Sequence, residues 1–319
     1  MTVADQSLDW QQALKAIQAA VTPRIGSGIV ADYIPALASV DPKKFGLAVA
    51  LNGGDMHCLG DADESFSMQS ISKVFTLALT LKQVGDALWK HVGREPSGSP
   101  FNSIVQLEAE RGIPRNPLIN AGAIVTTDKL VSAYGGGAVG ADQAIADLLQ
   151  LFQRLAHDDS IFIDQKVAKS ESDAGSRNRA LAHFMTSFGN MTNPVNATLS
   201  AYFRHCSVAI SCRQLARAAL FLAFDGTDPV TGEQIVNQRR CRRILAVMMS
   251  SGHYDNSGDF AFRIGLPGKS GVGGGILAVA PDHGTIAVWS PGLNRAGTSM
   301  VGSIALEELV RQTGWSVFG

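Results

Sequence analysis

The sequence has few cysteines, few charged side chains and no long uninterrupted apolar run. Its four cysteines, Cys58, Cys206, Cys212 and Cys241, form no C-x-x-C pair, which argues against a disulfide framework or a zinc knot and favours buried, reduced thiols. The longest uncharged stretch, residues 180–203, is interrupted by Asn, Thr, Ser and Pro. A membrane span needs about 20 apolar residues, so no membrane partner is expected.

Charge of either sign is also scarce. Only 17% of the residues are charged, and 27 basic against 28 acidic side chains leave a net charge of -1. Such a chain has no strong field for gathering nucleic acid or an anionic membrane, so a small ligand is the expected partner. With 319 residues, 45% of them hydrophobic, the chain can bury the core of one large or two ordinary domains.

The N-terminal residues do not resemble an export signal. Asp5 and Asp9 precede any basic residue, and Trp10, Leu14 and Ile17 recur at helical spacing. This pattern predicts an amphipathic surface helix. We therefore expect a cytoplasmic protein.

Strand patterns lie towards both ends of the chain, and helical patterns lie between them. Apolar runs at 45–51 and 56–59 flank Asn52-Gly53-Gly54-Asp55, and runs at 275–280 and 285–289 flank a Pro-Asp-His-Gly turn, so each pair predicts a hairpin. We expect an α+β fold in which residues 1–68 and 236–319 form a sheet domain. Residues 69–235 would form a mainly helical domain, with the active site in the cleft between the two.

Two glycine patterns suggest nucleotide binding and are rejected. Gly135, Gly137 and Gly140 match G-x-G-x-x-G, but no strand precedes them, and the run is interpreted as a loop between helices. Gly268-Lys269-Ser270 resembles the end of a phosphate loop, yet Arg263 stands where the earlier glycine is required.

A Ser-x-x-Lys pair, Ser70 and Lys73, opens a predicted helix. Three residues on a helix place both side chains on one face, where the amine reaches the hydroxyl, and a helix N-terminus favours the neutral amine. On spacing alone, a capping serine beside a solvated lysine is the more common arrangement. Later in the chain, Lys269-Ser-Gly is followed by glycines and a predicted strand, an arrangement that lets a substrate approach the backbone.

Ser-x-x-Lys early and Lys-Ser-Gly late resembles the serine β-lactamase and penicillin-binding fold, an antiparallel sheet built from both chain ends with a helical domain inserted. Longer segments are similar to the bacterial, serine-dependent glutaminase family from about Tyr33 to the C-terminus. They are QSISKVF (69–75), EPSGSPFNS (95–103), NPLINAGAI (116–124), Tyr254-Asp255 and KSGVGGGI (269–276). His253 and Gly268 depart from the usual family pattern, and Gly268 is expected to loosen the approach to the strand.

The resemblance implies hydrolysis of L-glutamine to L-glutamate and ammonia, with Ser70 as nucleophile and either Lys73 or Tyr254 as general base. The implied substrate contacts are Tyr33, Ser70, Asn120, Glu171, Asn178, Tyr202, Tyr254 and Val272, the last through its backbone. The resemblance implies no cofactor and no metal. It implies a homo-oligomer, either a dimer or a tetramer.

Three alternatives accompany these expectations. Without the family, the three tyrosines read as core or interface rings, the asparagines as caps or turns, and Glu171 as a solvated acid. A different serine hydrolase of the same fold, acting on β-lactams or peptides, would share the nucleophile and lysine. A catalytically silent sensor would bind glutamine without releasing ammonia.

Overall fold

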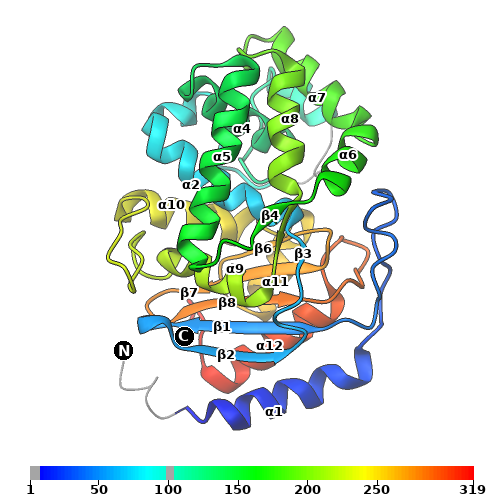
Figure 1. Ribbon diagram of the computed structural model, residues 1–319, viewed down its shortest axis with the longest axis vertical. Coiled ribbons are helices and arrows are strands. Elements are labelled where there is room, and N and C mark those ends of the chain that lie inside the picture. Colours follow the sequence, from blue (N-terminus) through cyan, green and yellow to red (C-terminus); the bar gives the residue numbers. More distant parts are fainter. Residues whose placement is uncertain (1–7, 98–103) are drawn as a thin grey trace.

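A five-stranded antiparallel sheet lies in the lower half of the molecule as viewed in Figure 1. The computed structural model describes residues 8–97 and 104–319, so Asp5 and residues 98–103 of the 95–103 motif lie outside the described residues. The strand order is β2-β1-β8-β7-β6, with β1 at Gly46–Leu51, β2 at Met56–Gly60, β6 at Gly268–Ser270, β7 at Gly275–Ala280 and β8 at Gly284–Trp289. Both predicted hairpins are confirmed, and β1 joins them by pairing with β8.

The central strands are apolar at nearly every position because both faces of the sheet are covered. On one face, Leu47 and Ile286 pack with α1 (Trp10–Val21) and α12 (Met300–Thr313). On the other face, Ala48 and Ala287 pack with α9 (Cys212–Ala219), which the 3₁₀ helix Leu220–Leu222 extends. The amphipathic N-terminal helix is thus confirmed, and it lies against the sheet (Figure 1).

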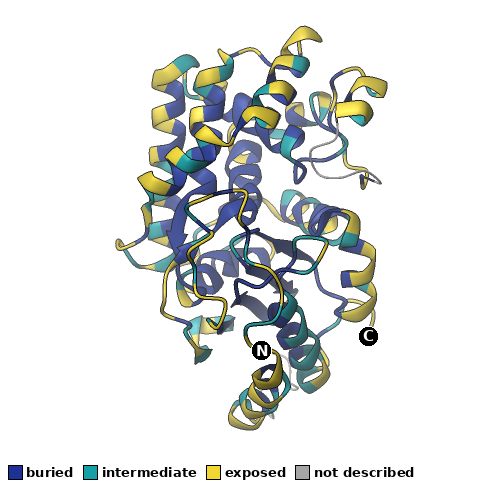
Figure 2. Cartoon of the chain, turned by 90° about the vertical axis from the view of Figure 1, so that its right-hand side faces the viewer, coloured by how far each residue is buried: buried dark blue, intermediate teal, exposed yellow. Residues whose placement is uncertain are grey.

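The segment between the two ends is helical. Its main elements are α2 (Ser72–Val84), α3 (Ile104–Ala109), α4 (Asn120–Ala133), α5 (Gly137–Ala156), α6 (Gln165–Asp173), α7 (Ser176–Ser187) and α8 (Val195–Cys206), and α10 (Gln238–Ser251) and α11 (Ser257–Arg263) follow α9. Helix α2 is buried from Ser72 to Leu81, and its Phe75 ring lies 4.5 Å from that of Phe152. Figure 2 shows buried residues gathered in the sheet and the inner helices.

Several short elements were not predicted. A second sheet, ordered β3-β5-β4, consists of Phe66–Ser67, Val208–Ile210 and Phe162–Ile163. Short 3₁₀ helices lie at Thr22–Arg24, Asn52–Gly54, Gln69–Ile71, Gly85–Lys90 and Tyr254–Asn256. Gly137 and Gly140 belong to α5, so the glycine-rich loop is only 134–136, and Gly268–Ser270 is a strand rather than the approach to one.

The α+β class is confirmed, while the division into domains stays a prediction. The larger sheet draws its strands from 46–60 and 268–289, as expected. Helix α9, however, belongs to the inserted 69–235 segment and yet contacts the sheet directly. The Thr285 hydroxyl donates to the carbonyl of Ala216 at 2.6 Å.

Candidate active site

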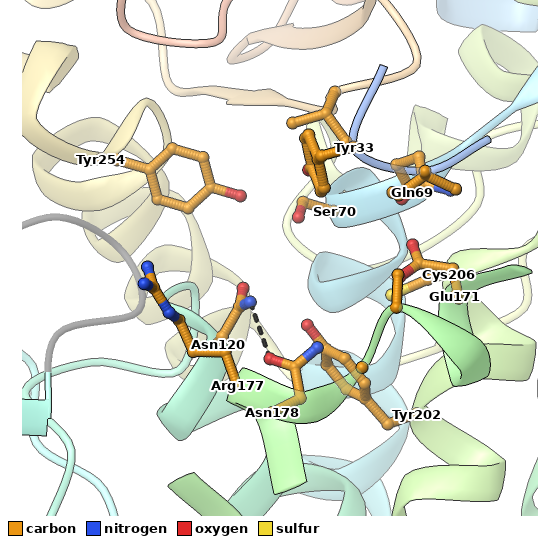
Figure 3. Close-up of a pocket in the computed structure, with 14 residues that line it drawn as sticks. Tyr33, Gln69, Ser70, Asn120, Glu171, Arg177, Asn178, Tyr202, Cys206 and Tyr254 are labelled. Atoms are coloured by element: carbon orange, nitrogen blue, oxygen red, sulfur yellow. Dashed lines mark hydrogen bonds between the residues drawn. The ribbon is translucent and has the colours of Figure 1, made fainter. Parts of the chain in front are cut away.

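A cavity of about 360 Å³ collects residues from both parts of the chain (Figure 3). Its lining includes every residue expected at the site except Lys73, which is buried. The lining residues are Tyr33, Ile34, Gln69, Ser70, Asn120, Glu171, Ala174, Gly175, Arg177, Asn178, Tyr202, Cys206, Tyr254 and Val272. The volume suits a small ligand with most of its surface enclosed.

Ser70 is presented by a tight turn just before α2. Gln69, the preceding residue, has a φ of 52°, a left-handed conformation that is costly for a residue with a Cβ. The turn is held because the Ser72 hydroxyl donates to the Gln69 carbonyl at 2.7 Å. Ser70 itself is only 9% exposed and lines the cavity together with Tyr254. A strained turn therefore fixes this hydroxyl at the cavity wall.

Lys73 lies one helical turn after Ser70 and is almost fully buried. Its amine donates to Asn120 Oδ1 at 2.7 Å and to the Leu118 carbonyl at 3.4 Å. Burial lowers the pKa of Lys73 to about 8, although the charge of Glu171 opposes the shift. About one tenth of the amine is thus neutral at pH 7, far more than for an ordinary lysine, and this fraction is able to accept a proton.

Tyr254 approaches Ser70 from the opposite part of the chain, in the 3₁₀ helix Tyr254–Asn256. Its φ is 58°, a second left-handed non-glycine residue at this cavity. Burial raises the pKa of Tyr254 well above its usual range, so the hydroxyl stays protonated. The Lys269 amine lies 4.2 Å from the Tyr254 ring centroid and donates to the Gly252 and Ser270 carbonyls at 2.9 and 2.7 Å. Lys269 thus supports the segment that carries Tyr254.

The turn 271–274 between β6 and β7 places Val272 next to the serine. A Cβ on Gly271 would lie 2.6 Å from the Met68 carbonyl oxygen, and one on Gly273 would lie 2.3 Å from that of Ser67. Only glycine permits this contact between the turn and the segment that leads to Ser70. The Trp289 indole also donates to the Gly273 carbonyl at 3.0 Å.

Polar side chains cover the remaining wall. Asn120 Nδ2 donates to Asn178 Oδ1 at 3.0 Å, so Lys73, Asn120 and Asn178 form one chain of hydrogen bonds. Burial raises the pKa of Glu171 to about 7, and a hydrogen bond from Gln69 together with the charge of Lys73 limits the rise. Glu171 is therefore a buried carboxyl at a cavity and not the solvated acid that its sequence context also allowed.

The two other predicted tyrosines differ in exposure. Tyr202, in α8, is 3% exposed, whereas Tyr33 is 54% exposed and lies at the mouth of the cavity. Cys206 also lines the cavity, but burial raises the pKa of its thiol to about 12, so the thiolate is scarce. Ser70 is the better nucleophile candidate of the two.

Sequence reasoning missed Gln69, Arg177 and Cys206 as lining residues. Gln69 adjoins the serine, and Arg177 adjoins Asn178, so adjacency to a motif residue was the available signal. His205 belongs to no motif in the sequence, and it is buried in α8, with Nδ1 2.7 Å from the Ser72 hydroxyl. Within residues 8–97 and 104–319, no cluster of three or more His, Cys, Asp or Glu has the arrangement of a metal site.

The glycine at position 268 lies in the buried strand β6, and its departure from the family pattern has a structural explanation. A Cβ at this position would lie 2.8 Å from His253 Nε2 and 2.7 Å from the Phe260 ring. The His253 ring stacks on Phe260 with centroids 3.5 Å apart and is 1% exposed. The two departures from the family pattern therefore touch each other, and Gly268 provides the space that His253 fills.

Known proteins match this chain over nearly its whole length. The family model described as Glutaminase covers residues 28–318. A glutaminase of Rhizobium rhizogenes is 57% identical over 98% of this chain and 99% of its own, and a thermolabile glutaminase of Rhizobium etli is matched to the same extent.

Solved structures agree. A probable glutaminase, ybaS, superposes with a TM-score of 0.89 at 38% identity over 98% of this chain and 99% of its own. A probable glutaminase from Bacillus subtilis complexed with 6-diazo-5-oxo-L-norleucine gives a TM-score of 0.85 at 29% identity over 97% and 96%. These neighbours confirm the β-lactamase-like fold. The chain belongs to the glutaminase family.

Proposed function

We propose that this glutaminase hydrolyses L-glutamine to L-glutamate and ammonia through a γ-glutamyl ester on Ser70. The observation that carries the proposal is the position of Ser70, which lines the cavity together with Tyr254 and lies one helical turn before the buried Lys73. Membership of the family supports the amide as substrate. In the first step the Ser70 oxygen bonds to the amide carbon while its proton leaves.

Lys73 is the proposed acceptor of that proton. Its pKa of about 8 leaves neutral amine available, whereas the raised pKa of Tyr254 makes a phenolate scarce. Tyr254, protonated and lining the same cavity as Ser70, is the proposed donor to the nitrogen of the departing ammonia. Cleavage of the carbon–nitrogen bond then leaves the ester, and the proton on Lys73 returns to Tyr254. Water attacks the ester carbonyl and gives one proton to the Ser70 oxygen as glutamate leaves.

The negative oxygen of each tetrahedral intermediate would be stabilised by the backbone amides of Ser70 and Val272. The close contact of Gly271 and Gly273 with the 67–68 backbone supports this assignment, because it brings the two segments together. Glu171 would bind the substrate's α-ammonium group. Tyr33, Asn120, Asn178 and Tyr202 would enclose the rest of the substrate.

Trapping of the nucleophile tests the proposal. Purified protein should release ammonia from L-glutamine far faster than from L-asparagine, because the shorter side chain displaces the carbon, and about 1 Å of displacement can reduce the rate about a hundredfold. Ser70→Ala should abolish turnover while the fold persists. Mass spectrometry after treatment with 6-diazo-5-oxo-L-norleucine should locate the adduct on Ser70, and an adduct on Cys206 would overturn the assignment.

Ammonia release, glutamine binding and nitrocefin cleavage separate the two other functions, a silent sensor and a different serine hydrolase. A silent sensor would bind glutamine without ammonia release, and a β-lactam hydrolase would cleave nitrocefin in preference to glutamine.

We also propose a cytoplasmic location and a homo-oligomeric state. The free cysteines support a reducing compartment, and sedimentation analysis tests the oligomer. No helix in the described part of the chain is long and apolar enough to cross a membrane.

A further inference from the structure

The proposed substrate carries two opposite charges on one carbon, an α-ammonium and an α-carboxylate. Among the described residues that line the cavity, Glu171 is the one acid and Arg177 the one lysine or arginine. Figure 3 shows these two side chains on opposite sides of the cavity, with Asn120 and Asn178 between them. Glu171 accounts for the ammonium, which leaves the carboxylate without a charged partner in the proposed function.

Arg177 occupies the first turn of α7, next to Asn178. The N-terminal end of a helix carries partial positive charge, so an arginine there is unfavourable unless an anion lies close by. In the described structure no side chain caps this end of α7, and its first turn contains no acidic residue. An anion bound at this wall of the cavity would neutralise both the guanidinium and the helix end.

The Arg177 guanidinium also has no carboxylate partner within the described residues, whose ion pairs involve other arginines. Residues 98–103 contain no acid either. Arg179, two residues further along the same helix, provides a contrast. It donates to the Ser172 hydroxyl at 3.3 Å and lines a separate cavity with Lys169 and Arg204.

We propose that Arg177 binds the α-carboxylate of the substrate and thereby restricts the enzyme to amides with a free α-carboxylate. This inference rests on the proposed function. The guanidinium fork matches a carboxylate in two parallel hydrogen bonds, which neutral asparagine side chains do not provide. Because Arg177 is exposed at the cavity wall, its charge also attracts the incoming carboxylate.

The test compares L-glutamine with 4-aminobutanamide, the same molecule with hydrogen in place of the carboxylate. Arg177→Gln should reduce kcat/KM for L-glutamine about tenfold, the range of one charge-assisted bond at an exposed site, and leave 4-aminobutanamide within about twofold. Arg177→Lys should recover part of the loss. Arg179→Gln is the matched control and should change neither substrate.

A binding measurement completes the test and separates it from the proposed function. Calorimetry with L-glutamate and 4-aminobutanoate should show that Arg177→Gln weakens only the former. An equal loss for both ligands, or no loss for glutamate, would overturn the role of Arg177. Absence of ammonia release from L-glutamine by the unaltered protein would instead reject the proposed function, and the glutamate comparison would still decide on Arg177.

Discussion

The side-chain oxygen of Asn120 accepts a hydrogen bond from the Lys73 amine at 2.7 Å, while the amide nitrogen of Asn120 donates to Asn178. One asparagine therefore links the proposed base to the wall that would hold the substrate. Because the oxygen faces the amine, the state of Lys73 and the orientation of the asparagine depend on each other. This contact leads to the first prediction.

Asn120→Asp should raise the pKa of Lys73, because a carboxylate at this distance stabilises the ammonium form. The neutral amine would then exist only at higher pH, and the acid limb of the kcat/KM profile should move up by about one to three pH units. Asn178→Asp places its charge one hydrogen bond further away and should shift the limb less. Equal shifts in the two variants, measured from pH 6 to 10, would contradict the arrangement.

The pH profile of the unaltered enzyme should itself rise through two steps. Glu171, with a pKa of about 7, binds the ammonium only when ionised, and Lys73, with a pKa of about 8, accepts a proton only when neutral. Glu171→Gln should remove the lower step. It should also move the remaining step slightly below 8, because the charge of Glu171 raises the pKa of Lys73.

The same Glu171→Gln variant should raise KM more than it lowers kcat. The ammonium keeps its charge throughout the reaction, so the contact stabilises ground and transition states alike. Affinity should fall about ten- to hundredfold. Steady-state kinetics decide the role, since an unchanged KM with kcat lower by several powers of ten would make Glu171 an acid or base.

Tyr254→Phe should slow glutamine hydrolysis about 10²- to 10⁴-fold if the hydroxyl protonates the departing nitrogen. An activated substrate, the γ-(4-nitrophenyl) ester of L-glutamate, needs no such proton because nitrophenolate leaves unaided. Its ester bond should be cleaved by the variant nearly as fast as by the unaltered enzyme. A matching loss on the ester would identify Tyr254 as the base for Ser70.

Gly268→Ala should destabilise the protein by about 1–3 kcal/mol, the usual range for an overpacked site. The new methyl group would press on the His253 and Phe260 rings. In a His253→Ala background the loss should be smaller, because one of the two obstacles is gone. Gly258→Ala in α11 is the control, since nothing lies within 4 Å of a Cβ there. Thermal denaturation compares these four variants with the unaltered protein.

His205 should make the protein sensitive to acid. Burial lowers its pKa to about 3, against about 6.5 when unfolded, so the unfolded chain takes up a proton first. The protein has the full stabilisation from neutral His205 above pH 6.5 and loses it as the pH falls towards 3, and the loss amounts to about 2 kcal/mol at pH 5. His205→Gln should flatten this dependence in part, because the pKa of buried His253 is also lowered. His183 is exposed, so His183→Gln should leave the pH dependence of stability unchanged.

The hairpins and the main helices were predictable because their signals are local. Uninterrupted apolar runs that end at glycine, proline or asparagine predict buried strands, and β1, β7 and β8 are such runs. The strands β3 and β4 have two residues each, too few for any period, and they exist because β5 pairs with both. Strand β6 has only three residues and is flanked by glycines, so it also is too short to show a period.

The site was predictable only through the resemblance to a family. Ser70 and Lys73 share a local spacing, but Glu171 and Tyr254 approach them from residues about 100 and 180 positions away. No periodicity encodes such a meeting. Gln69 and Arg177 were not predicted as lining residues. Gln69 reaches the cavity because of the left-handed turn at this residue, and Arg177 because of the direction in which the first turn of α7 points.

The pairing of β1 with β8 has a consequence for folding during synthesis on the ribosome. Residues 46–51 emerge long before residues 284–289, so one edge of β1 stays without its partner until translation is nearly complete. Joining strands so distant in sequence is slow, and an unfilled strand edge invites association with other chains. An incomplete chain therefore exposes the unpaired edge of β1 until residues 284–289 have emerged.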